Sequence, residues 1–286
     1  MKGGIDFHVH PVLIREMIRK YPELAAACRE TYYCGNAFQP LEVMLAEFDL
    51  VAIDRAVLLP VDATTSRGAK IYSNEQIAEL CGMSDRFIGF ASVDPHQESA
   101  PQQLRQAIAG LGLRGLKLDP AMQDFEPSDK RYYPLYETAA ELRIPILFHA
   151  GLSFAPRSKL RQGHPTLFED IAADFPGLNI VLAHLAWPWV VEAVALAIKY
   201  PNVYLDTSAL YFDNPYDFLS YAMTKQVPLT VFERTLRKQI VFGSNNPRSE
   251  TKTMARAIRG LGFSEDCLEL VFRVNAERLL AGERAC

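Results

Sequence analysis

The chain has 286 residues, a net charge of −4 and a hydrophobic fraction of 49%. That length and apolar content suit one α/β domain, and the mildly acidic balance with scattered Lys and Arg excludes a basic nucleic-acid surface. No apolar run approaches the roughly 18 residues of a membrane span. With no signal-peptide pattern, and with five cysteines that form no CxxC pair, we expect a cytoplasmic protein with reduced thiols that binds no membrane.

Short apolar runs alternate with helical patterns almost throughout the chain. We predict strands at residues 5–9, 55–59, 87–93, 115–118, 144–149, 179–184, 203–206 and 240–242. Helices are predicted at 41–50, 74–81, 102–110, 133–142, 165–175, 190–199, 229–236 and 250–258, with a final pair at 264–272 and 275–280. The strands are apolar at nearly every position, which is typical of parallel strands covered on both faces.

Eight such strand–helix units favour a closed barrel over an open sheet. No glycine-rich nucleotide-binding pattern follows any of the strands, and no linker divides the chain. We therefore predict an α/β fold, a single (β/α)8 TIM barrel over residues 1–286. The long insert at 11–40, after the first strand, could form a lid over the barrel mouth.

Four of the six histidines fall at the carboxyl ends of predicted strands one, five and six. They are His8, His10, His149 and His184. In barrels this face carries the active site. Residues two apart on a strand point to the same side, so His8 and His10 can chelate one ion, and neutral imidazole is a common ligand of divalent metals. The alternative for each histidine alone is a packed ring that is hydrogen-bonded to the backbone.

Several fragments resemble the amidohydrolase superfamily, and most closely its amidohydrolase 2 branch, which includes aminocarboxymuconate-semialdehyde decarboxylase. The fragments are IDFHVHP at 5–11, GLKLDP at 115–120, IPILFHAG at 144–151, AHL at 183–185, NVYLD at 202–206 and FGS at 242–244. The resemblance implies one divalent metal, zinc or alternatively manganese, on His8, His10 and His149. It also implies that His184 acts beside the metal as acid and base.

The sequence departs from this family at the end of strand eight. The family has FGSD there, whereas this chain has FGSN, so that Asn245 stands at the place of the aspartate. An amide oxygen can still ligate, but it accepts no proton near neutral pH. Proton transfer could have moved to His184 or to another acid such as Asp119 or Asp206. Otherwise the reaction needs no base on strand eight, or the chain is a weakened relative that only binds a ligand.

Three further residues are candidates for substrate binding. Lys117 ends strand four and could anchor a carboxylate; in two-metal relatives a carboxylated lysine bridges the ions at this strand. Arg157 lies in the loop after strand five and could bind an oxyanion in bidentate fashion, or be solvated. Trp187 follows His184 and could line a pocket for an aromatic substrate, or it could cap the next helix.

The resemblance implies three functions. The first is a metal-dependent hydrolase that acts on an ester, lactone or amide in a small carboxylate-bearing molecule, with metal-activated water and His184 as acid and base. The second is a metal-dependent decarboxylase of an aromatic or dienoic acid. The third is a pseudoenzyme whose metal site Asn245 has weakened. The expected partner is a small acidic substrate, and the resemblance also allows a homodimer.

Overall fold

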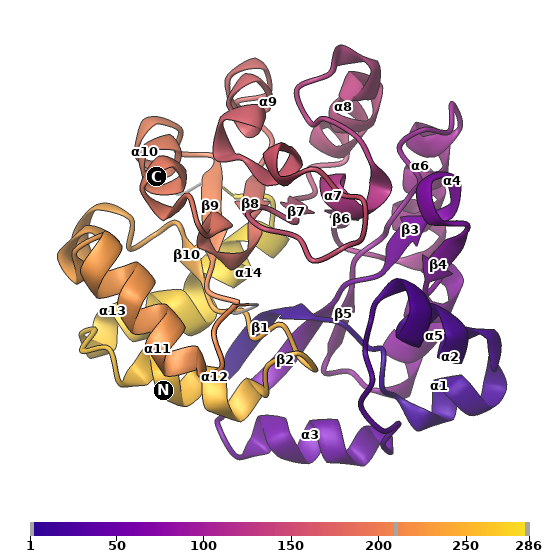
Figure 1. Ribbon diagram of the computed structural model, residues 1–286, viewed down its shortest axis with the longest axis horizontal. Helices are drawn as coiled ribbons and strands as arrows, with labels where there is room; N and C mark the ends of the chain where they lie inside the picture. The colour runs from indigo at the N-terminus through magenta and orange to yellow at the C-terminus, as the bar shows by residue number, and fades with distance from the viewer. Residues whose placement is uncertain (1–2, 209–210, 284–286) are drawn as a thin grey trace.

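A computed structural model describes residues 3–208 and 211–283. Short strands lie at the centre of the molecule (Figure 1), and eight of them form its parallel sheets. They are β1 (Gly4–Val9), β2 (Ile53–Leu58), β5 (Phe87–Gly89), β6 (Leu116–Leu118), β7 (Ile146–Phe148), β8 (Ile180–Leu182), β9 (Val203–Asp206) and β10 (Ile240–Val241). Each predicted strand overlaps one of these, and most are shorter than predicted.

The strands form two parallel sheets, in the orders β1-β2-β5 and β10-β9-β8-β7-β6. Backbone contacts join the sheets at both seams. At one seam, Lys117 N–H donates to the Ala91 carbonyl over 2.7 Å. At the other, Phe7 N–H donates to the Phe242 carbonyl over 2.8 Å. These seams close the barrel and confirm the predicted fold class.

Helices surround the strands on the outside (Figure 1). They are α1 (Arg15–Lys20), α2 (Glu23–Ala26), α3 (Leu41–Asp49), α4 (Thr64–Arg67), α5 (Asn74–Met83), α6 (Ala100–Leu111), α7 (Pro120–Gln123), α8 (Tyr133–Glu141), α9 (Glu169–Asp174), α10 (Val190–Lys199), α11 (Pro215–Ser220), α12 (Thr251–Arg259), α13 (Glu265–Glu269) and α14 (Asn275–Leu280). Among the described residues, no helix combines the length and the hydrophobicity needed to cross a lipid bilayer.

Two apolar cores follow from the strand pattern. The smaller core fills the barrel with side chains such as Phe7, Leu147, Val181 and Tyr204. The larger core lies between the strands and the helices. Successive side chains of a strand point to opposite faces, so a strand can contribute to both cores. On β6, Leu116 and Leu118 belong to the outer core, which leaves Lys117 between them for the interior.

Several local features differ from the predictions. A hairpin of β3 (Val61–Ala63) and β4 (Ala69–Ile71) follows β2; its strands are too short for an alternating pattern to identify. Helix α11 was not predicted, and the helix predicted at 229–236 is a π-helical turn at Val231–Thr235. The insert at 11–40 contains α1, α2 and a second π-helical turn at Ala27–Thr31. The cysteines within the described ranges are free thiols.

Candidate active site

The four histidines predicted at strand ends come together in the structure. The Nε2 atoms of His8 and His10 lie 3.1 Å apart. Nε2 of His184 lies 3.2 Å from Nδ1 of His149, and the His8 and His184 ring centroids are 5.0 Å apart. All four side chains are buried. The carboxyl ends of β1, β7 and β8 therefore build one imidazole cluster.

Hydrogen bonds on the far side of each ring fix the tautomers of His8 and His10. Nδ1 of His8 lies 2.7 Å from an oxygen of Asp206, and Nδ1 of His10 lies 2.9 Å from the carbonyl of Leu59. A carboxylate and a carbonyl only accept, so both Nδ1 atoms carry the proton. Each neutral ring is then left with a lone pair on Nε2, and the two lone pairs face each other across 3.1 Å.

Two facing lone pairs require a cation between them, either a proton or a metal ion. Burial lowers the pKa of His8 and of His10 well below 6.5, and the charges of Lys117 and neighbouring histidines lower both further. A shared proton is thus disfavoured. Carboxylate and backbone acceptors behind imidazoles are the arrangement that orients histidine ligands toward a metal. The donor set therefore fits a divalent ion.

His149 is the third histidine expected to bind the metal. Its Nδ1 is the atom that faces His184, while its Nε2 is buried with no hydrogen-bond partner among the described residues. A buried nitrogen without a partner costs free energy unless something fills the position. The expectation that His8, His10 and His149 share one metal remains a prediction.

A hydrogen-bonded network stands behind His184. Asp206 accepts the backbone N–H of His184 over 2.9 Å and also the hydroxyl of Ser208. The Ser208 hydroxyl oxygen lies 2.7 Å from Nδ1 of His184. Among the described residues, the group of three whose ligand atoms all lie within 4.8 Å of one another is His8, His184 and Asp206, which differs from the predicted set of three histidines. The 2.7 Å contact between His8 and Asp206 is, however, that of a hydrogen bond.

Asp6 anchors the loop that carries Asn245. The carboxylate accepts the backbone N–H of Ser244 over 2.9 Å and the hydroxyl of Thr251 over 3.1 Å. Burial raises the pKa of Asp6 to about 7, against the effect of these hydrogen bonds. Asn245 has a left-handed backbone with φ of 68°. Its N–H donates to the His8 carbonyl over 2.9 Å, so the strand-eight position is tied directly to the histidine strand.

A chamber of about 220 Å³ opens onto the cluster. Its lining includes His10, His149, His184, Asn245, Lys117, Asp119, Tyr32, Tyr33, Phe154 and Arg248. Nζ of Lys117 is buried, with one contact of 3.3 Å to the Leu118 carbonyl. Burial lowers its pKa to about 8, although Asp119 and Asp206 oppose this. Asp119 caps α7 by accepting the N–H of Met122 over 2.9 Å.

The other two predicted substrate residues do not line the chamber. Arg157 is exposed, on a loop where its φ is 63°. Trp187 packs on Tyr211, with ring centroids 4.6 Å apart, and its buried Nε1 has no hydrogen-bond partner among the described residues. The geometry thus brings Lys117 to the histidines, but not Arg157 or Trp187.

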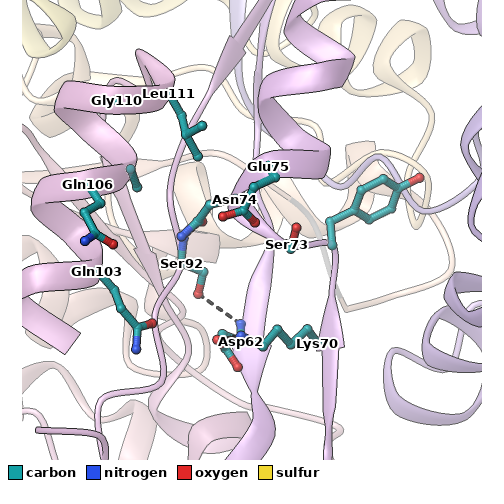
Figure 2. A pocket seen from close by; sticks show the side chains of 12 residues that line it. Asp62, Lys70, Ser73, Asn74, Glu75, Ser92, Gln103, Gln106, Gly110 and Leu111 are labelled. Carbon is teal, nitrogen blue, oxygen red and sulfur yellow. Dashed lines mark hydrogen bonds and ion pairs between the residues drawn. The ribbon is translucent and has the colours of Figure 1, made fainter. Parts of the chain in front are cut away.

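A larger cavity, of about 490 Å³, is lined by residues of the β3–β4 hairpin, of α5 and of α6. Figure 2 shows Asp62 and Ser92 joined on its wall. Ser92 accepts the Asp62 N–H and donates to the Lys117 carbonyl, both over 3.0 Å, and Asp62 pairs with Lys70 over 2.7 Å. Through Ser92 this wall is tied to the backbone at Lys117.

The fold and this cluster define a class: a (β/α)8 barrel with a candidate metal centre at the carboxyl ends of its strands. A model of the Amidohydrolase family matches residues 5–281. The chain belongs to the amidohydrolase family, as its motifs indicated. This superfamily consists of metal-dependent enzymes, both hydrolases and decarboxylases.

Solved structures with the same fold include an uncharacterised TIM-barrel protein from Bordetella bronchiseptica, 24% identical, with 98% of this chain and 99% of that chain covered and a TM-score of 0.75. A putative 2-pyrone-4,6-dicarboxylic acid hydrolase from Pseudomonas putida is 20% identical, with 99% of each chain covered and a TM-score of 0.69. A mutant 5-carboxyvanillate decarboxylase from Novosphingobium aromaticivorans with bound manganese is 16% identical, with 98% and 97% covered and a TM-score of 0.67. At these identities the likeness shows the fold alone.

One curated relative also matches, over a short stretch. Protein fluG of Emericella nidulans is 34% identical over 67 residues. These residues make up 23% of this chain, and the chain spans only 8% of that protein.

Sequence reasoning missed three residues that the structure brings to the site. Tyr32 packs on His10, with ring centroids 4.7 Å apart, and Ser208 joins His184 to Asp206. Arg248 lines the chamber. Arg248 follows the end of strand eight by only a few residues, and this position on the catalytic face could have marked it. No sequence pattern pointed to Tyr32, because it lies within an insert whose fold cannot be predicted from the sequence.

Proposed function

We propose that this chain is a metal-dependent hydrolase that cleaves an ester, lactone or amide in a small substrate bearing a carboxylate. The observation that carries the proposal is the pair of Nε2 atoms on His8 and His10, 3.1 Å apart with both Nδ1 protons directed outward. This arrangement supports a bound cation. Zinc is the first candidate and manganese the second, because imidazole ligands suit both.

His8, His10 and His149 would hold the ion. When bound, a divalent metal supplies Lewis-acid polarisation of a substrate oxygen and a lowered pKa for a water molecule. His184 would accept and return a proton at Nε2, while its Nδ1 remains bonded to Ser208. Lys117 would hold the substrate carboxylate, because its buried ammonium has two N–H groups beyond the contact to Leu118.

A metal-dependent decarboxylase is the second candidate. Tyr33 and Phe154 are 49% and 60% exposed and both line the chamber, which favours a planar aromatic acid as the ligand. Asn245 cannot donate an acidic proton to carbon. The proton in this reaction would have to come from His184 or from Asp119.

The test begins with the metal content per chain, measured by elemental mass spectrometry on protein purified without chelator. We expect about one zinc or manganese in the wild type and less than a tenth of that in His10→Ala. His164→Ala is the matched control, since His164 lies outside the cluster beside Trp189. About two ions would instead indicate that Lys117 bridges them.

The metal-loaded protein would then be screened with carboxylated esters, lactones and amides for release of acid, and with aromatic acids for release of CO₂. Acid release that His184→Ala abolishes supports the hydrolase, and CO₂ release supports the decarboxylase. A wild type that takes up no metal even after reconstitution overturns both proposals. The pseudoenzyme, with a metal site weakened by Asn245, is then the function that remains.

A further inference from the structure

Three residues line both the chamber and an outer cavity beside it. Tyr33, Phe154 and Arg248 contribute to the chamber of about 220 Å³ and to the outer cavity of about 440 Å³. They therefore form a neck between the histidine cluster and the solvent. A substrate that reaches the cluster from the outer cavity passes Arg248.

The insert holds the Arg248 guanidinium in one orientation. The group lies over the Tyr32 ring, 4.4 Å from its centroid, and it donates to the Tyr32 carbonyl. Tyr32 itself is buried against His10. A guanidinium has five N–H donors in a planar fork that matches a carboxylate. The guanidinium also hydrogen-bonds to the Tyr32 side chain. These contacts to one residue orient the fork and leave further N–H donors for a ligand.

Positive charge thus stands at both ends of a small chamber. Lys117 lies at the inner end, on β6 and buried, whereas Arg248 lies at the neck. The lining carboxylate of Asp119 lies nearer the inner end: one oxygen caps α7, the other lies 4.0 Å from Nδ1 of His149, and its charge favours the protonated form of Lys117. The chamber is smaller than the roughly 300 Å³ at which pockets for drug-sized ligands begin, so it suits a molecule with a single ring.

We propose that Arg248 binds a carboxylate of the substrate at the neck, and that the substrate is a single-ring acid with two acidic groups. One acidic group meets Lys117 and the other meets Arg248, with the ring between Tyr33 and Phe154. This inference rests on the proposed function for the role of Lys117, and it adds Arg248 as the residue that selects diacids over monoacids.

Binding to the metal-loaded protein tests the inference without knowledge of the natural substrate. Isothermal titration calorimetry would compare isophthalate, which has two carboxylates on one ring, with benzoate, which has one. The variants are Arg248→Gln, which keeps polarity but loses charge, and Arg248→Lys, which keeps charge but loses the fork. Arg157→Gln is the matched control, because this arginine is exposed and outside the chamber lining.

We expect Arg248→Gln to weaken isophthalate binding by about tenfold or more, which is the usual effect of losing a charged hydrogen-bond partner. Benzoate binding should change by less than about twofold, because Lys117 holds its carboxylate. Arg248→Lys should fall between the wild type and Arg248→Gln, and Arg157→Gln should leave both ligands unaffected. Arg248 is exposed, so the variants should melt close to the wild type.

Equal isophthalate affinity in Arg248→Gln and Arg157→Gln would overturn the inference, as would a wild type that does not prefer isophthalate to benzoate. Metal content measured on the same samples separates this result from failure of the proposed function. A protein that holds its metal but shows no effect at Arg248 refutes only the diacid inference. A protein without metal refutes the proposed function, and the comparison of the two arginine variants can still be made.

Discussion

His8 and His10 direct their unprotonated Nε2 atoms at each other across 3.1 Å, while Asp206 and Leu59 hold the opposite nitrogen of each ring. The carboxylate and the carbonyl prevent either ring from turning its proton inward. Without a cation this arrangement is electrostatically unfavourable in a buried site. The folded state therefore gains free energy when the cluster binds a metal.

Chelation should accordingly lower the thermal stability of the protein. A ligand present at 100 times its dissociation constant contributes about 2.7 kcal/mol to the folded state, which corresponds to a fall in Tm of about 5 to 10 °C in a chain of this size. Differential scanning calorimetry before and after EDTA, and after zinc is returned, measures the change. His10→Ala is the control and should not respond; a wild-type Tm indifferent to EDTA would contradict the prediction.

Replacing Asn245 by aspartate should strengthen the metal site. Asn245 is buried at the chamber wall, and Asp tolerates its left-handed backbone about as well as Asn. The substitution adds a negative charge beside the histidine strand, so zinc affinity should rise at least about tenfold. Competition with a chromogenic chelator measures the affinity.

Asn36→Asp gives the same charge change at an exposed position outside the chamber and should leave zinc affinity unchanged. If Asn245→Asp also raises the rate at which the protein hydrolyses a substrate found in the screen, the asparagine limits proton transfer in the natural chain. An unchanged zinc affinity would mean that residue 245 does not face the ion.

Ser208 acts as a positioning residue for His184. Its hydroxyl links Nδ1 of His184 to Asp206, and partners of this kind behind an active imidazole are worth about 10- to 100-fold in activity. Ser208→Ala should therefore lower kcat within this range and change KM little. Ser208→Thr, which restores a hydroxyl, should recover most of the activity.

A merely structural role for Ser208 would leave the His184 ring unaffected. NMR of protein with ¹⁵N-labelled histidine reports the tautomer directly. We expect the His184 resonances to show mixed tautomers in Ser208→Ala and a single tautomer in the wild type and in Ser208→Thr. Unaltered histidine resonances together with unaltered kcat would count against the positioning role.

The sequence predicted the barrel and the histidine cluster because both depend on local patterns. Strand-length apolar runs identified β1 through β10, apart from the short hairpin, and the HxH spacing placed His8 and His10 on one side of a strand end. The neck depends instead on contacts between distant segments. Tyr32 and Arg248 are 216 positions apart, and only the folded insert brings them together. The sequence therefore favoured Arg157 as the arginine of the site and did not identify Arg248.

Lys117 should make the protein less stable at neutral pH than it would be with an apolar side chain. Burial lowers the folded-state pKa of this lysine from 10.5 to about 8. Between these values the unfolded chain binds more protons than the folded one, so stability falls as the pH decreases from about 10.5 to 8 and stays reduced below that. The shift corresponds to about 3 kcal/mol at pH 7.

Lys117→Met keeps the side-chain length and removes the charge. It should raise the free energy of unfolding at pH 7 by up to about 3 kcal/mol, and the difference from the wild type should vanish near pH 10.5. Urea titrations of both proteins at pH 7, 9 and 10.5, with EDTA present to remove any metal effect, measure this difference. The same variant should lose affinity for benzoate, because the anchoring charge is gone. Greater stability with weaker ligand binding would identify Lys117 as a residue retained for function at the cost of folding stability, whereas a pH-independent difference would assign the effect to packing alone.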